Sequence, residues 1–174
     1  MEPLLYHLTD IKTPRLTLNP LTVRDVPAFH DMTNDPRITE RIHFLASPFT
    51  IEAATAILQN HANGQDCFWG VRLNDAPGLI GTVGTHLRAA DEIEIGYWFL
   101  PAVQGHGYAL ESVSFVLSAL ANAYPTRRIY AECCPENTAS WRLLERAGFR
   151  SANLEGKRPG RVKLTYIPEQ RNRE

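Results

Sequence analysis

A glycine-containing turn, Gln104-Gly105-His106-Gly107-Tyr108-Ala109, lies between a strand-like apolar run and an amphipathic helical pattern. The strand pattern covers residues 92–100, and the helical pattern continues to about residue 123. A strand that turns through glycines into a helix directs several backbone N–H groups at one point, where the helix dipole adds positive potential. The turn therefore suits a phosphate or pyrophosphate group.

Three phosphate-binding patterns can be compared with this turn. A dinucleotide-binding fingerprint requires glycine or alanine three places after Gly107, where this chain has Leu110. A P-loop requires Gly-Lys-Ser/Thr before the helix, and the turn lacks this triplet. The pattern Q/R-x-x-G-x-G/A of a pyrophosphate-binding turn is satisfied by Gln104, Gly107 and Ala109. An ordinary turn that needs glycine for its dihedral angles stays open as the alternative.

A second helical segment, Pro135–Phe149, begins directly after a strand pattern at residues 128–134. Asn137 is a predicted N-cap of this helix. Because its strand is expected beside the strand at 92–100, Asn137 and Ser140 should open toward the same crevice as the glycine turn. Capping by itself also explains the asparagine.

Length and composition indicate a globular chain with one domain, residues 1–174. The net charge of −1 gives no electrostatic footprint for nucleic acid. No apolar run approaches the roughly 20 residues of a membrane helix, and the amino terminus has no secretion-signal pattern, so we expect a cytoplasmic protein without a membrane partner.

Three cysteines, two of them adjacent, match neither a disulfide framework nor a zinc site, so we expect free thiols and no metal.

The other patterns alternate between short helices and strands and predict a mixed α/β (α+β) fold. The strand patterns between residues 68 and 100 follow one another as an antiparallel meander. The strands at 92–100 and 128–134 flank a helix, so they are expected to be parallel neighbours. We predict a mostly antiparallel sheet of about six or seven strands, flanked by helices. The strand patterns lie at residues 15–20, 68–73, 79–87, 92–100, 128–134, 149–155 and 161–167, and the helical patterns at about 22–33, after 36, and at 50–63, 107–123 and 138–147.

Together these segments resemble the motifs of the GNAT superfamily of acetyl-CoA-dependent N-acetyltransferases, over roughly residues 13–167. The strand, Q-x-x-G-x-A turn and helix resemble the acetyl-CoA pyrophosphate site, and N-x-x-S followed by L-L-E-R-x-G-F resembles the later helix of these enzymes. Further segments are similar to the RimJ/RimL type, which acetylates protein N-termini, notably of ribosomal proteins, and has relatives that act on small amines. These segments are T-P-R-L-T-L at residues 13–18, N-D-P at 34–36, E-I-G-Y-W at 94–98 and P-E-N-T-A-S at 135–140.

The resemblance implies acetyl-CoA as co-substrate and a GNAT fold in which the two parallel strands splay apart. The backbone of 99–101 would pair with the pantetheine arm like an added strand, and amides from Gly105 to Leu110 would hold the pyrophosphate. A strand amide near Phe99 would polarise the thioester carbonyl, and Asn137 would face the pantetheine or a water near the sulfur. The expected acetyl-CoA contacts are Phe99, Leu100, Pro101, Gln104, Gly105, His106, Gly107, Tyr108, Ala109, Leu110, Asn137 and Ser140.

Acetylation requires a neutral amine, so a base or a water chain must remove a proton of pKa about 8 to 10. Glu94 and Glu132 are the candidate bases, because their strands should border the crevice and they match places where some GNAT relatives have a catalytic glutamate. A solvated strand face or an ion pair is the alternative. Ser140 is the candidate general acid, since Leu144 replaces the tyrosine of many GNAT enzymes and RimJ/RimL relatives have serine at residue 140. A local hydrogen bond to the backbone is the alternative for this serine.

Further candidates, for contacts to the acceptor, are Trp69, His43 and His86. A histidine there could relay a proton, and a structural hydrogen bond is the alternative. The basic run at residues 157–163 is expected to be a solvated hairpin face, or else a contact to the 3′-phosphate of CoA or to an acidic partner.

The sequence thus predicts direct transfer of an acetyl group from acetyl-CoA to a primary amine in a ternary complex, with a protein N-terminal α-amine as the first choice of acceptor. Two alternatives stay open: acetylation of a small amine such as an aminoglycoside, polyamine or amino-acid-like compound, and a non-catalytic acyl-CoA-binding module. The expected partner is the acceptor amine, without nucleic acid, and the chain is expected to be a monomer or a homodimer.

Overall fold

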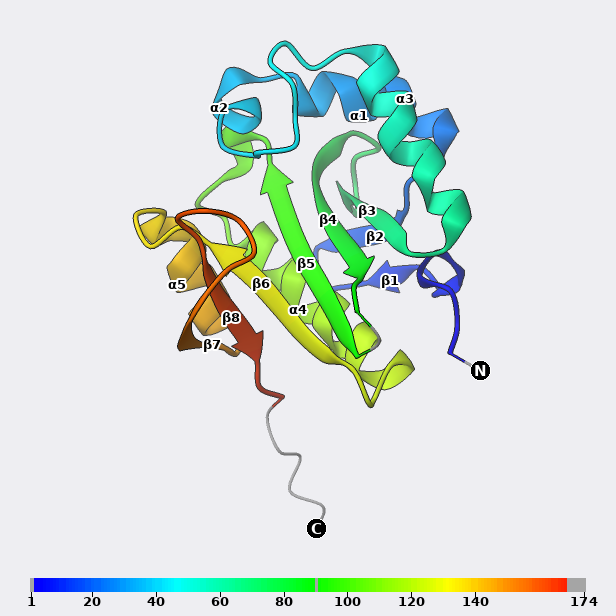
Figure 1. Ribbon diagram of the computed structural model, residues 1–174. Coiled ribbons are helices and arrows are strands. Elements are labelled where there is room, and N and C mark those ends of the chain that lie inside the picture. Colours follow the sequence, from blue (N-terminus) through cyan, green and yellow to red (C-terminus); the bar gives the residue numbers. More distant parts are fainter. Residues whose placement is uncertain (1, 90, 169–174) are drawn as a thin grey trace.

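The computed structural model describes residues 2–89 and 91–168, so Met1, Ala90 and residues 169–174 of the expected domain lie outside the described part (Figure 1). The elements are, in chain order, η1 (Leu5–His7), β1 (Ile11–Lys12), β2 (Leu16–Pro20), η2 (Val23–Asp25), α1 (Val26–Thr33), α2 (Pro36–Thr39), α3 (Ile51–Gln59), η3 (Asn60–Asn63), β3 (Asp66–Leu73), β4 (Leu79–Leu87), β5 (Glu92–Phe99), η4 (Pro101–Val103), α4 (Tyr108–Ala123), β6 (Arg128–Cys133), α5 (Thr138–Arg146), β7 (Phe149–Glu155) and β8 (Val162–Tyr166).

The described strands form one 8-stranded sheet in the order β1-β2-β3-β4-β5-β6-β8-β7. Neighbouring strands are antiparallel except β5 and β6, which are parallel and are joined by the crossover through α4. The predicted mixed, mostly antiparallel sheet is confirmed. The additional strand is β1, whose two residues pair with β2 but are too few to give a period-two pattern in the sequence.

The two parallel strands separate along their length (Figure 1). Only Glu92, Ile93 and Glu94 of β5 have partners in β6, and residues 95–99 continue without one on that side. The expected splay is therefore present. It leaves the edge of β5 open to an extended ligand, because unpaired strand edges carry free N–H and C=O groups.

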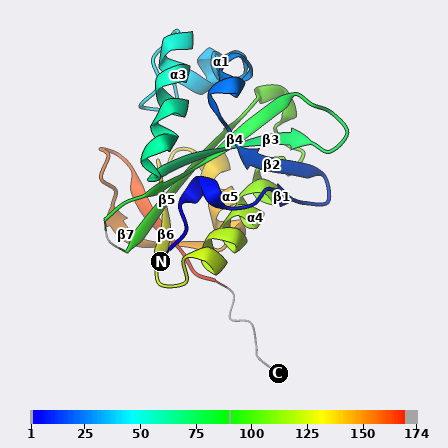
Figure 2. The same cartoon turned by 90° about the vertical axis from the view of Figure 1, so that its right-hand side faces the viewer.

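The sheet separates two hydrophobic clusters, with α1 and α3 on one side of it and α4 on the other (Figure 2). On α4, Val113, Leu117 and Leu120 recur at helical spacing, are buried and pack on one face of the sheet. Each such side chain stabilises the fold by about 1.5–3 kcal/mol relative to an exposed position. This packing fixes the start of α4, and hence the glycine turn, against the sheet.

The helix ends differ slightly from the sequence pattern. Thr50 caps α3 through a hydrogen bond from the Ala53 N–H, 3.1 Å long, but the α-helix ends at Gln59 and continues as the 3-10 turn η3. The predicted N-cap Asn137 accepts a hydrogen bond from the Ser140 N–H at the start of α5, at 3.3 Å. Of the helices described, none is long and apolar enough to cross a membrane.

Candidate functional site

A cavity of about 1470 Å³ opens where β5 and β6 separate, and its walls come from both faces of the sheet. Most of the expected acetyl-CoA contacts line it, whereas Leu100, Pro101 and His106 are not among its lining residues. The structure thus brings the glycine turn, the start of α5 and both candidate glutamates to one space. The lining includes Phe99, Gln104, Gly105, Gly107, Tyr108, Ala109, Leu110, Asn137 and Ser140, and also His43, His86, Glu94, Glu132 and Arg158.

The glycine turn has the backbone conformation that the sequence pattern predicts. Gly105 and Gly107 have φ angles of 85° and 80°, a region that L side chains rarely adopt. Gly107 is the N-cap of α4 and no side chain caps this end, so the first N–H groups of the helix have no intrahelical partner. A Cβ atom at Gly105 would meet nothing within 4 Å, so the turn is open on that side. Its exposed amides and the helix dipole fit a pyrophosphate group.

The edge of β5 supplies a further backbone donor. The Leu100 N–H points toward β4, where it donates to the Ile80 carbonyl at 2.9 Å. Because successive N–H groups of a strand point to opposite edges, the Phe99 N–H points toward the gap that β6 leaves. This donor has a fixed backbone position, which is the requirement for polarising a carbonyl oxygen.

Two hydroxyl groups meet on the side of the sheet that α4 and α5 cover. The Tyr97 hydroxyl lies 2.7 Å from the Ser140 hydroxyl and 3.4 Å from the Ser140 carbonyl oxygen. Burial raises the pKa of Tyr97 well above its ordinary value, so the phenol stays protonated at neutral pH. Sequence motifs point to Ser140, whereas Tyr97 enters them only as one letter of E-I-G-Y-W. The period-two alternation of Ile95, Tyr97 and Phe99 is the signal that could have placed Tyr97 on this face.

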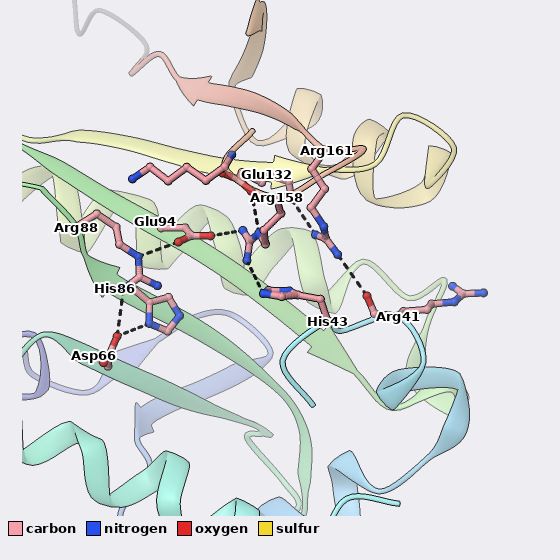
Figure 3. Close-up of polar contacts among 10 residues, drawn as sticks. Arg41, His43, Asp66, His86, Arg88, Glu94, Glu132, Arg158 and Arg161 are labelled. Carbon is pink, nitrogen blue, oxygen red and sulfur yellow. Dashed lines mark hydrogen bonds and ion pairs between the residues drawn. The ribbon is translucent and has the colours of Figure 1, made fainter. Parts of the chain in front are cut away.

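Glu94 and Glu132 lie on the opposite face, where both contact Arg158 (Figure 3). Glu94 accepts from Arg158 Nη2 and, at 2.9 Å, from Arg88 Nε. Glu132 accepts from Arg158 Nε at 2.8 Å and from the Lys157 N–H at 2.7 Å. The carboxylates, their arginines and the loop between β7 and β8 therefore form one network.

This network corrects the expectation that the basic run at 157–163 is a solvated hairpin face. Arg158 bridges the two carboxylates with only 27% of its side chain exposed, and Lys163 pairs with Glu92 at 2.5 Å. Buried carboxylates require counter-charges. The loop between β7 and β8 therefore lies folded inward, with Arg158 against Glu94 and Glu132. Arg158 is a site residue that sequence reasoning misses, because a charge run by itself does not reveal which charges lie inside.

The network determines the charge of Glu94. Burial acts to raise the pKa of its carboxyl group, but the hydrogen bond from Arg88 and the charges of Arg158 and Arg88 outweigh burial, and the pKa is lowered below its ordinary value. Glu94 is thus an ionised and weak base at neutral pH. The Glu132 side chain is only 1% exposed, against 10% for Glu94, so Glu94 is the more accessible of the two candidate bases.

The two histidines lie beside this network, as Figure 3 shows. His86 Nδ1 lies 2.6 Å from Asp66 Oδ1, and His43 Nε2 lies 3.4 Å from Arg158 Nη1. Burial and the positive charges of Arg158 and Arg161 lower the pKa of His43, so its ring is mostly neutral at pH 7.

Of the three candidate acceptor contacts, Trp69 is the one that the structure does not bring to the cavity. Its side chain is fully buried in the core that α4 covers, its Nε1 donates to Thr85 Oγ1 at 3.3 Å, and it is not among the cavity-lining residues. A large indole on a central strand stabilises the fold by filling the space between sheet and helix. The expectation of an acceptor contact is therefore corrected: Trp69 supports the sheet.

The cysteines are free, and Cys133 lines the cavity near the helix that carries Ser140. Burial raises the pKa of the Cys133 thiol, which leaves little thiolate at neutral pH and does not favour a nucleophilic role. Within residues 2–89 and 91–168, no group of three His, Cys, Asp or Glu residues is placed to hold a metal ion.

The sequence and the fold were compared with those of known proteins, and both comparisons find acetyltransferases. The profile of the family described as "Acetyltransferase (GNAT) domain" matches residues 15–150. The chain is 33% identical over 150 residues to the uncharacterized N-acetyltransferase YoaA of Bacillus subtilis (strain 168), an alignment that covers 83% of this chain and 84% of YoaA.

Solved structures extend the comparison to the fold. A GNAT-family acetyltransferase from Bacillus anthracis superposes with a TM-score of 0.74 at 25% identity, over 90% of this chain and 95% of that one. RimL, a ribosomal L7/L12 α-N-protein acetyltransferase in complex with coenzyme A, superposes with a TM-score of 0.72 at 18% identity, over 90% and 96% of the two chains. At that identity the likeness to RimL concerns the fold alone.

Proposed function

The chain belongs to the acetyltransferase (GNAT) family, and on this premise we propose that its acceptor is the α-amine of a protein amino terminus. As a member of this family, it is an acetyl-CoA-dependent N-acetyltransferase. The resemblance to RimJ/RimL sequence motifs supports the α-amine acceptor. RimL, whose fold this chain shares, is an α-N-protein acetyltransferase, which agrees with this choice.

The observation that carries this proposal is the pairing of Glu94 and Glu132, two carboxylates in the cavity, with arginines. Glu94 is held by Arg88 and Arg158, and its lowered pKa makes it a weak base. An α-amine of pKa about 8 is roughly one-quarter neutral at about pH 7.5, whereas a lysine or alkylamine of pKa about 10.4 is only about 0.1% neutral. A site with a weak base therefore favours the α-amine.

The same pairing disfavours a polycationic acceptor. Asp66, Glu94 and Glu132 each have an arginine or histidine partner, so these carboxylates are not an unpaired acidic row for an aminoglycoside or a polyamine. Favourable binding of several ammonium groups would require such a row.

For the donor, we propose that the amides of the glycine turn and of the first turn of α4 hold the pyrophosphate of acetyl-CoA. The open edge of β5 would pair with the pantetheine arm, and the Phe99 N–H would donate to the carbonyl oxygen of the acyl group. When bound, acetyl-CoA supplies the activated acyl group that the amine attacks. Asn137 would contact the pantetheine end from the start of α5.

For the acceptor, we propose that Glu94 receives the proton of the amine through water and that Ser140 donates a proton to the leaving sulfur. Glu94 lies on one face of the sheet and Ser140 on the other, and both line the cavity at the gap between β5 and β6. Holding the amine against the acyl group in this gap lowers the barrier by several kcal/mol, to order of magnitude, without a covalent acyl-enzyme.

The test compares four acceptors by release of CoA thiol and by mass analysis of the product. They are a lysine-free peptide with a free amino terminus, its N-blocked counterpart with one lysine, spermidine, and an aminoglycoside. We expect kcat/KM for the free amino terminus to exceed that for the lysine peptide by about 200-fold, following the neutral fractions of the two amines. A higher value for spermidine or the aminoglycoside would contradict the proposal. Binding of CoA without turnover of any amine would indicate a non-catalytic module instead.

A further inference from the structure

Arg15, which lies just before β2, reaches the amino terminus of α4 and binds Glu111 there. Its Nε lies 2.7 Å from Glu111 Oε2, and its backbone N–H donates to Oε1 at 3.0 Å. The Thr13 hydroxyl donates to the same carboxylate at 2.6 Å. Arg15 is not among the residues that line the cavity, so it differs from the contacts described above.

Glu111 lies in the first turn of α4, at the helix end that we propose for the pyrophosphate. Burial acts to raise the pKa of its carboxyl group, but the hydrogen bonds from Thr13 and Arg15 outweigh burial and lower it, so the group is ionised at neutral pH. Without a counter-charge, a carboxylate there would cancel the positive potential of the helix end and repel a bound anion. The guanidinium of Arg15 offsets this charge close to where the anion must bind.

Arg15 also holds the glycine turn itself. Its Nη1 donates to the His106 carbonyl oxygen at 2.9 Å, and its guanidinium lies 4.6 Å from the centre of the Tyr108 ring. In a planar trans peptide the C=O and the following N–H point in opposite directions. The Gly107 N–H therefore points away from Arg15, and Gly107 is one of the residues that line the cavity.

We propose that Arg15 is a positioning residue for acyl-CoA: it neutralises Glu111 and fixes the His106–Gly107 peptide so that the turn accepts a pyrophosphate. This inference rests on the proposed placement of the pyrophosphate at the turn. Arg15 acts through Glu111 and the backbone, without a contact of its own in the cavity.

The test is a double-mutant cycle in which CoA is titrated calorimetrically into the wild type, Arg15→Ala, Glu111→Gln and the double variant. We expect Arg15→Ala to weaken CoA binding about tenfold, because it leaves a charged Glu111 beside the anion. In the double variant that charge is gone, so its Kd should be at least about threefold lower than that of Arg15→Ala. A double variant that binds no more tightly than Arg15→Ala would overturn the neutralising role.

A second measurement separates positioning from general stability. Pantetheine lacks the pyrophosphate, so its affinity should be the same in Arg15→Ala and the wild type, and in turnover only the KM for acetyl-CoA should rise, with kcat unchanged. Arg128→Ala is the matched control, because it removes an exposed arginine that pairs with Asp91 and does not line the cavity. Equal loss of pantetheine and CoA affinity in Arg15→Ala would mean a structural role only and would overturn the inference.

The placement of the pyrophosphate is checked separately with Ala109→Glu, which puts a carboxylate into the turn of a protein with an intact Arg15. If this variant binds CoA normally, the proposed placement fails and the inference on Arg15 fails with it. If it loses CoA while Arg15→Ala binds CoA like the wild type, the placement stands and only the inference on Arg15 is wrong.

Discussion

The hydroxyl oxygens of Tyr97 and Ser140 lie 2.7 Å apart, although 43 positions separate them in the chain. Tyr97 comes from the part of β5 that has no partner in β6, Ser140 comes from the first turn of α5, and both line the cavity. Leu144, at the place of the tyrosine in many GNAT enzymes, is a buried aliphatic side chain that has no proton to donate. The fold thus brings Ser140, which we propose as the proton donor to the leaving sulfur, into contact with a second hydroxyl group.

Removing the Ser140 hydroxyl should reduce turnover more than removing that of Tyr97. We expect Ser140→Ala to lower kcat by about 10- to 100-fold, and Tyr97→Phe by less, since Tyr97 only orients the serine. The double variant should be no slower than Ser140→Ala, and CoA affinity should stay near that of the wild type. Steady-state kinetics with the α-amine peptide checks this. Independent, multiplying losses in the double variant would show that the two hydroxyls do not act as a pair.

Replacing the proposed proton acceptor should slow the reaction without weakening the donor. Glu94→Gln should lower kcat/KM for the peptide acceptor by about 10- to 100-fold with CoA affinity near normal, because it removes the base but keeps the shape of the side chain. Glu132→Gln is the matched comparison. It removes a carboxylate that is almost inaccessible but holds Arg158, so its main effect should be a lower free energy of unfolding. Unchanged rates in Glu94→Gln would remove this residue from the mechanism.

Arg158→Ala should shift to higher pH the part of the acid limb of the pH–rate profile that reports Glu94, which lies below the break that the α-amine sets at about pH 8. The pKa of Glu94 in the folded protein is lowered in part by the charge of Arg158, whereas burial acts in the opposite direction. Without the guanidinium, less of the effect of burial is offset and the pKa of Glu94 rises, so protonation begins at higher pH. Measuring kcat/KM for both proteins from about pH 4 to about pH 9 checks the direction. A limb that stays in place would show that another group controls it.

The lowered pKa of Glu94 also predicts how stability depends on pH. A carboxyl group whose pKa is lowered on folding adds stability above its unfolded pKa of about 4.3, and this contribution is lost as the pH falls through the folded pKa. Urea unfolding of the wild type should therefore show a declining free energy of unfolding below about pH 4.3. In Arg158→Ala this decline should be shallower, since the pKa of Glu94 is no longer lowered to the same extent. An equally steep decline in both proteins would assign it to other carboxyl groups.

Gly156→Ala should destabilise the protein by about 1–3 kcal/mol. A Cβ atom at Gly156 would lie 2.9 Å from Glu132 Cδ and 3.0 Å from the Arg161 carbonyl oxygen, so the loop that carries Arg158 would have to move. Gly78→Ala is the control, because a Cβ there meets nothing within 4 Å. Thermal or urea unfolding measures both variants. Equal stability of the two would mean that the loop adapts without cost.

Much of the fold can be predicted from local pattern. The short apolar runs of β3, β4 and β5, separated by turn residues, and the apolar stripe of α4 predict elements whose types and approximate bounds are confirmed. These patterns work because a helix on the sheet must bury one face, whereas the central strands are covered by a hydrophobic cluster on each side of the sheet. The strand β1 escapes prediction because two residues are too few to show a period.

The glycine turn and the Asn137 cap are also readable in the sequence, since positive φ angles and N-caps depend on neighbouring residues alone. The strand pair β5–β6 follows from the helix between the two strands. The sequence by itself thus determined the fold class, the turn that suits a pyrophosphate and, through the GNAT motifs, the family.

Only the tertiary structure decided which charges and hydroxyls meet. Arg158 lies against Glu94 and Glu132 from 64 and 26 positions away, and Arg15 binds Glu111 across 96 positions. Trp69, a candidate acceptor contact by sequence, is a core residue in the structure. Long-range ion pairs and burial depend on how the sheet and loops pack in three dimensions, and neither periodicity nor spacing along one chain encodes those distances.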